Sequence, residues 1–154
     1  MVKPNAVRAS TVRASTVRAL PALLWMAAIW LSSARPWPQA SNLIADFLLT
    51  LPQVVLALMV VVPPDKVIHL LVYAVLGGLW WWALLPGRAD HPRGRAMAAW
   101  AIAAVFGGID ELHQGFVAGR SRDAADWGAD AVGALLAVVL LAALQHRQIQ
   151  RATP

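Results

Sequence analysis

Long apolar segments alternate with short polar strings along this chain, and this alternation limits its fold more than any other feature. A helix of about 20 apolar residues crosses the ~30 Å hydrocarbon core of a bilayer. Only 14% of the residues are charged, against about 25% in an ordinary soluble domain, so the chain cannot cover a soluble surface. We therefore expect an all-α membrane protein with one small domain. The apolar segments run over residues 19–34, 42–62, 67–85, 96–112 and 126–144.

The rest of the composition excludes several kinds of chemistry. The chain has no cysteine, which excludes disulfides, thiolate catalysis and cysteine-ligated metals. A net charge of +5 would favour nucleic acid as the partner of a soluble protein. Here the basic residues lie between apolar segments, where membrane topology explains them, and we expect no nucleic-acid partner.

The two ends of the chain are predicted to lie in the cytoplasm. Residues 1–18 repeat the string Val-Arg-Ala and have low complexity, which indicates a disordered or interfacial basic tail. Residues 146–154 form the C-terminal tail. A basic leader, an apolar run and the string Ser32-Ser33-Ala34 also resemble a signal peptide, so cleavage of residues 1–34 stays open as an alternative.

The charge distribution favours four transmembrane helices. If residues 42–62 do not cross the membrane, nine of the thirteen basic residues lie on one side, in the two tails and in the loop at 86–95. This is the excess of positive charge expected on the cytoplasmic side. Residues 42–62 then form a re-entrant or interfacial segment, and Pro52 and Gln53 at its middle suit a bend. Five spans are the alternative.

Polar residues gather in two strings at the ends of apolar segments. Ionisable groups at membrane depth are costly, which favours a functional role for them. Asp65, His69 and Tyr73 are spaced at i, i+4 and i+8 and share one face of a helix, as do Asp110 and Gln114. With four spans both strings face outward. The predicted polar cluster comprises Asp65, Lys66, His69, Tyr73, Asp110, Glu111, Gln114, Arg120, Ser121 and Asp126.

The residue types in this cluster leave its chemistry open. Asp110 and Glu111 are adjacent carboxylates, so one of them is expected to bind a proton or to pair with Arg120 or Lys66. Together with His69 they are candidates for acid–base catalysis. A structural network of ion pairs that closes the bundle is the alternative. The spacing matches no standard metal-ligand set, and we expect neither a metal nor a cofactor.

In these strings the sequence resembles the VanZ-like membrane family over roughly residues 22–142. The resemblance rests on four motifs in order, and the domain is placed at residues 19–145. Two positions depart from the family pattern: Ala118 stands where Pro is usual, and Asp130 where Asn is usual. The motifs are Ile29-Trp30-Leu31-Ser32-Ser33, Asp65-Lys66-x-x-His69-x-x-x-Tyr73, Asp110-Glu111-x-x-Gln114-x-Phe116-Val117-x-Gly119-Arg120-Ser121, and Asp126 with Gly133.

The resemblance implies a multi-pass protein of the bacterial cell envelope, in the plasma membrane. The family takes its name from a protein linked to teicoplanin resistance, and it supplies no settled reaction. We expect the outward cluster to bind a membrane lipid, such as a lipid-linked cell-wall intermediate, or a glycopeptide antibiotic. The alternatives are an enzyme that acts on such a lipid and a structural protein that acts through a partner. The oligomeric state is open.

Overall fold

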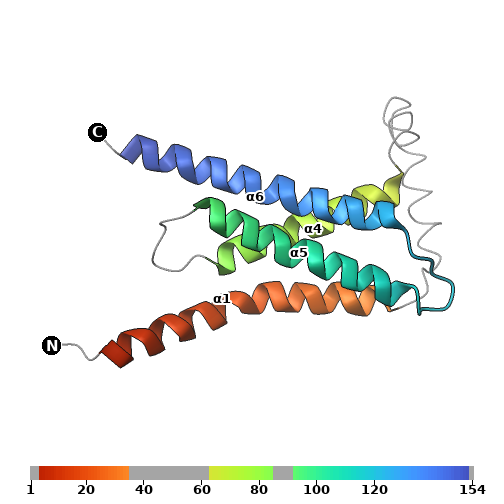
Figure 1. Ribbon diagram of the computed structural model, residues 1–154, viewed down its shortest axis with the longest axis horizontal. Helices are drawn as coiled ribbons and strands as arrows, with labels where there is room; N and C mark the ends of the chain where they lie inside the picture. The colour runs from red at the N-terminus through yellow and green to blue at the C-terminus, as the bar shows by residue number, and fades with distance from the viewer. Residues whose placement is uncertain (1–3, 35–62, 85–91, 153–154) are drawn as a thin grey trace, which may run out of the picture.

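The part of the protein that the structure describes is all-α, as predicted. A computed structural model describes residues 4–34, 63–84 and 92–152, with side chains from residue 17 onward in the first of these ranges. The segment at 42–62 lies outside the described residues. Proline begins three of the helices, where its missing amide hydrogen is tolerated. The helices are α1 (Pro4–Ser33), α4 (Pro64–Ala83), α5 (Pro92–Gln114) and α6 (Ala124–Ala152) (Figure 1).

Helices α4 and α6 pack so closely that small residues are required between them. A Cβ atom on Gly133 would lie 2.1 Å from the carbonyl oxygen of Leu70. A Cβ atom on Gly77 would lie 2.9 Å from the carbonyl oxygen of Ala134. Close approach of this kind gives the dispersion contacts that hold membrane helices together. Tyr73 and Val138 are buried in the bundle.

Indole groups tie the other helices to this pair. Trp25 of α1 donates to the carbonyl oxygen of Val72 in α4 at 3.0 Å. Trp100 of α5 donates to the carbonyl oxygen of Ala131 in α6 at 3.0 Å. These bonds satisfy polar groups that would be costly to leave unpaired in an apolar setting.

The outer surface of the bundle is strongly apolar. Large side chains along α6, such as Leu136 and Leu140, are more than half exposed, and exposed apolar surface on this scale is typical of a contact with a membrane or with another protein. Among the described residues, α4 and α6 are long and apolar enough to cross a membrane, whereas the apolar part of α1, Val17–Ser33, is shorter. The structure is therefore compatible with a membrane, and the four-span arrangement stays a prediction.

Both terminal helices extend into the predicted tails. Helix α1 begins at Pro4, so most of the segment predicted as a disordered or interfacial tail is helical. Arg and Ala are good helix formers, and the repeated string supplies both. Helix α6 continues to Ala152, beyond residue 146. The cytoplasmic location of these ends stays a prediction.

Four helix ends meet at one end of the bundle. The last turns of α1 and α5 lie beside the first turns of α4 and α6, and both chain termini lie toward the opposite end (Figure 1). Because α4 and α6 run opposite to α1 and α5, the two polar strings of the sequence come together. We call this region the polar end.

Candidate functional site

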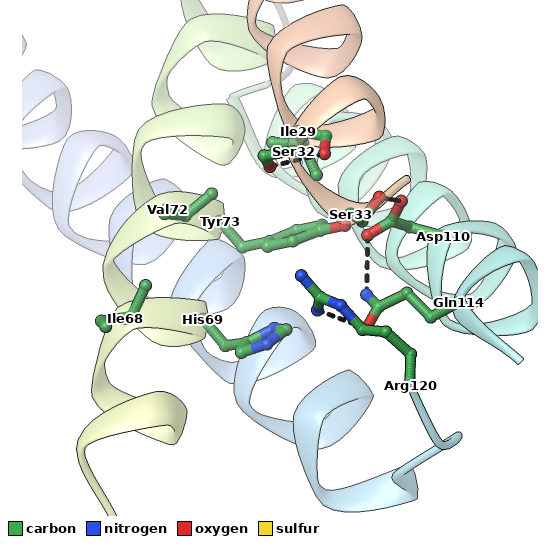
Figure 2. Close-up of a pocket in the computed structure, with 10 residues that line it drawn as sticks. All are labelled: Ile29, Ser32, Ser33, Ile68, His69, Val72, Tyr73, Asp110, Gln114 and Arg120. Carbon is green, nitrogen blue, oxygen red and sulfur yellow. Dashed lines mark hydrogen bonds between the residues drawn. The ribbon is translucent and has the colours of Figure 1, made fainter. Parts of the chain in front are cut away.

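A chain of hydrogen bonds links α1, α5 and the loop before α6. Ser33 donates to Oδ1 of Asp110 at 2.5 Å, and Gln114 donates to Oδ2 of the same carboxylate at 3.1 Å. Arg120 then donates to Oε1 of Gln114 at 3.0 Å (Figure 2). Both carboxylate oxygens of Asp110 are thus occupied inside the protein. Gly119, with φ of +79°, makes the turn that places Arg120 here.

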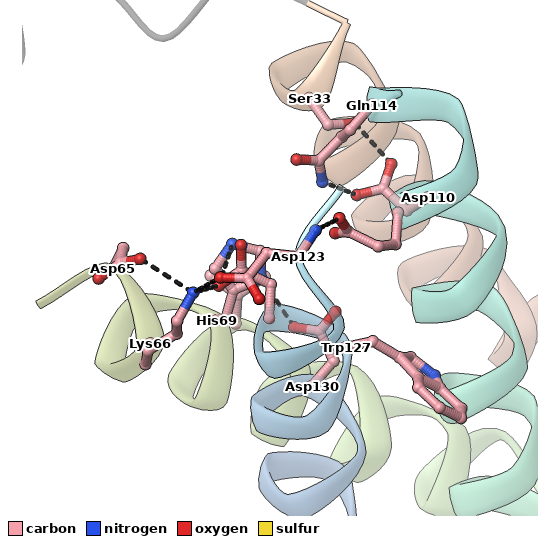
Figure 3. A network of polar contacts seen from close by, with 12 residues as sticks. Ser33, Asp65, Lys66, His69, Asp110, Gln114, Asp123, Trp127 and Asp130 are labelled. Carbon is pink, nitrogen blue, oxygen red and sulfur yellow. Dashed lines mark hydrogen bonds and ion pairs between the residues drawn. The ribbon is translucent and has the colours of Figure 1, made fainter. Parts of the chain in front are cut away.

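Lys66 is enclosed by carboxylates from α4, α6 and the loop. Its ammonium group lies 3.2 Å from Asp65 and 2.5 Å from Asp126, and it also pairs with Asp123 (Figure 3). The hydrogen bond from Lys66 holds the pKa of the half-exposed Asp123 below its usual value. Lys66 is therefore largely neutralised by its neighbours and has little charge left for an anionic ligand.

His69 is held by a buried carboxylate of α6. Its Nδ1 lies 2.9 Å from Oδ1 of Asp130, a residue with 2% of its surface exposed. Because an ionised carboxylate can only accept, Nδ1 carries the proton in this bond. When the ring is neutral, Nε2 is then an acceptor. Nε2 is 3.8 Å from Oδ1 of Asp126, which is beyond hydrogen-bond distance.

Glu111 belongs to a different part of the polar end. Its Oε1 accepts a hydrogen bond from the backbone N–H of Asp123, while Oε2 is buried with no partner among the described residues. Glu111 lines an apolar hollow with Leu112, Arg122 and Trp127. The adjacent carboxylates Asp110 and Glu111 thus lie in separate environments.

A small cavity lies between α1, α4 and α5 at the polar end. Its volume is about 90 Å³, room for several water-sized groups. The Tyr73 side chain reaches this cavity, and its hydroxyl group is buried without a hydrogen-bond partner in the described part of the chain. The lining combines apolar and polar residues: Ile29, Ser32, Ser33, Ile68, His69, Val72, Tyr73, Asp110, Gln114 and Arg120 (Figure 2).

A wider hollow adjoins this cavity. It measures about 270 Å³ and includes Ser121 and Gly119 in its lining. His69, Gln114 and Arg120 line both spaces, so they stand between the inner cavity and the wider hollow. The carboxylates of the wider hollow come from Asp65 and Asp126.

The structure brings all ten predicted cluster residues to the polar end but divides them among four environments. His69, Tyr73, Asp110, Gln114 and Arg120 line the cavity. Asp65, Ser121 and Asp126 line the wider hollow, Lys66 lies in the ion-pair network, and Glu111 lies in the apolar hollow. No group of three His, Asp or Glu side chains among the described residues is arranged to hold a metal ion.

Three contributors were absent from the predicted cluster: Ser33, Asp123 and Asp130. Asp130 stands at i+4 from Asp126, so the two share a helix face, and Ser33 lies next to the last residue of the first apolar segment. These positions were the available signal. His113, at i+3 from Asp110, stacks on Trp30 with ring centroids 3.9 Å apart and does not line the cavity.

Over the described ranges, the fold and the site define a helical protein with an apolar exterior and a polar cavity at one end. The model of the VanZ/LLP1 family matches residues 19–145. The chain belongs to the VanZ/LLP1 family. Family membership and the apolar helices indicate a membrane protein linked to the cell envelope and to antibiotic resistance. Comparisons with curated proteins and with solved structures give no significant match.

Proposed function

We propose that this is a multi-pass protein of the bacterial plasma membrane whose polar end faces outward and binds the head group of a lipid-linked envelope component. Both termini then lie in the cytoplasm. An amphiphilic antibiotic of the glycopeptide type is the alternative ligand. A ligand of either kind has a polar part and an apolar part, and both must be accommodated near the membrane surface.

The cavity beneath Arg120 is the observation that supports binding. One part of its wall is apolar, with Ile29, Ile68 and Val72, and the rest carries hydrogen-bonding groups. Binding sites for amphiphilic small molecules combine an apolar lining with a few placed polar groups in this way. Three basic side chains near the polar end are candidates to contact a ligand, namely Lys66, Arg120 and Arg122. The geometry favours Arg120, because Lys66 is enclosed by carboxylates and Arg122 lines another hollow.

Arg120 and Arg122 offer a matched pair for testing this proposal. The purified full chain in detergent is titrated with three lipids and observed by native mass spectrometry: a polyprenyl diphosphate-linked disaccharide, a glucosyl diacylglycerol and a phosphatidic acid. We expect Arg120→Ala to weaken binding of at least one lipid about tenfold or more, the typical effect of losing a hydrogen bond from a charged donor. Arg122→Ala should bind as the natural protein does. Equal binding of every lipid by all three proteins would refute the proposal.

An enzyme that acts on the same lipid is the second candidate, and the His69–Asp130 pair is the observation in its favour. A carboxylate that fixes the protonated Nδ1 of a histidine leaves Nε2 able to take a proton from a substrate hydroxyl or water. Asp110 is less suited to this task because both its oxygens already accept hydrogen bonds. The same lipid incubations distinguish the candidates, since an enzyme yields a lipid of new mass and a binding protein returns the lipid unchanged.

A further inference from the structure

The hydroxyl group of Tyr73 is the starting point for a statement about the ligand. Tyr73 has only 1% of its surface exposed, and its hydroxyl finds no hydrogen-bond partner among the described residues. Burying a hydroxyl without a partner is energetically unfavourable. The group lines the cavity, where a ligand atom would satisfy it (Figure 2).

The remaining polar groups in the cavity restrict the charge of that ligand. Asp110 already accepts hydrogen bonds from Ser33 and Gln114, one on each oxygen, so an ammonium group would have to share this carboxylate with both donors. Arg120, which also lines the cavity, repels a cation. A positively charged head group is therefore poorly matched.

An anionic head group is also poorly matched. A phosphate in the cavity would approach Asp110 directly, with Asp130 and Asp126 behind His69. Lys66, the nearest lysine along the helix, is already shared by three carboxylates. Like charges separated by a few ångströms in a low dielectric repel strongly.

We infer that the cavity receives a neutral, hydroxyl-bearing head group, such as the sugar of a glycolipid, which bonds to the hydroxyl of Tyr73 and to Nε2 of His69. This inference rests on the proposed function and names the chemistry of its ligand. A sugar hydroxyl both donates and accepts, so it matches a phenol that can do either and an imidazole nitrogen that accepts when the ring is neutral and donates when it is protonated. The apolar wall of Ile29, Ile68 and Val72 favours a lipid over a free sugar as the source.

Tyr73→Phe tests the inference because it removes one oxygen and little else. The full chain in detergent is titrated with glucosyl diacylglycerol, phosphatidic acid and phosphatidylethanolamine, all with identical acyl chains, and with methyl glucoside. We expect the natural protein to prefer the glucosyl lipid. Tyr73→Phe should weaken that binding about 2- to 10-fold, the effect of one neutral hydrogen bond, while the melting temperature stays the same or rises. The phosphatidic acid affinity should not change.

Several results would overturn this inference. Tighter binding of phosphatidic acid or of phosphatidylethanolamine, with Arg120→Ala still weakening it, would show the wrong head-group class and leave the proposed function standing. Methyl glucoside that competes as well as the glucosyl lipid would assign the cavity to a soluble sugar. A lower melting temperature of Tyr73→Phe with unchanged glucosyl-lipid affinity would give the hydroxyl a structural role. If no lipid binds at all, the proposed function fails together with the inference.

Discussion

At the scale of single residues, the polar end separates side chains that hold the fold from side chains that face the cavity. Lys66 and its three carboxylates connect α4 to the loop and to α6. Tyr73 and His69 instead border the cavity. The two groups should therefore respond differently to substitution, since loss of the first lowers stability and loss of the second lowers ligand binding.

Asp123 gives a prediction about acid stability. Its folded-state pKa is below the unfolded value because of the hydrogen bond from Lys66. A depressed carboxyl pKa stabilises the folded state above the unfolded pKa of about 3.9, and the contribution disappears as pH falls through the folded value. We expect Asp123→Asn to lower the melting temperature at pH 7. Between about pH 5 and pH 3, the melting temperature of this variant should fall less than that of the natural protein.

Asn is the informative replacement because it keeps the local turn. The Asp123 side chain accepts a hydrogen bond from the N–H of Ala125 at 2.8 Å, and an amide oxygen can do the same. The melting temperature of both proteins in detergent is followed by tryptophan fluorescence against pH. Identical profiles for the two proteins would contradict the role assigned to this ion pair.

At the scale of helices, the contact between α4 and α6 depends on Gly133. A methyl group there would lie 2.1 Å from the Leu70 carbonyl oxygen, so the two backbones must separate. Overpacking of this kind typically costs about 1–3 kcal/mol. We expect Gly133→Ala to lower the melting temperature clearly or to prevent folding.

Gly128 supplies the matched control on the same helix. A Cβ atom there meets nothing within 4 Å, and alanine favours helix over glycine by up to about 1 kcal/mol. Gly128→Ala should therefore keep or raise the melting temperature. If the two variants melt alike, the close packing seen between α4 and α6 is not what stabilises the bundle.

The sequence predicted the helices well because apolar length and polar interruptions are local signals. The segment predicted at 67–85 corresponds to α4, and those at 96–112 and 126–144 correspond to α5 and α6. Because successive predicted helices run in opposite directions, the two polar strings were expected to lie at the same end of the bundle. Helices α1 and α6 extend into the two predicted tails, and the low complexity and charge of residues 1–18 gave no direct indication of this helix.

The pairing of side chains could not be predicted in the same way. Lys66 was expected to pair with Asp110 or Glu111, yet its partners are Asp65, Asp123 and Asp126. Which groups meet depends on how each helix is rotated about its axis and on the path of the loop before α6. Helical spacing fixes neither of these. For the same reason, the adjacent residues Asp110 and Glu111 were grouped together although they line different spaces.

At the scale of the whole molecule, the proposed function requires the polar end to face the outside of the cell. The excess of basic residues in the tails and in the loop at 86–95 favours this orientation, because basic residues gather on the cytoplasmic side. The termini lie toward one end of the bundle and the cavity lies at the other (Figure 1). An outward cavity makes envelope lipids and antibiotics accessible as ligands, and an inward cavity excludes them.

The most direct test is cysteine labelling in intact cells, which the absence of natural cysteines makes clean. Ala118→Cys at the polar end and Gln148→Cys near the C-terminus both replace exposed residues. With a membrane-impermeant thiol reagent, we expect Ala118→Cys to be labelled in intact cells and Gln148→Cys to be labelled only after lysis. The reverse pattern would place the cavity in the cytoplasm and contradict the proposed function.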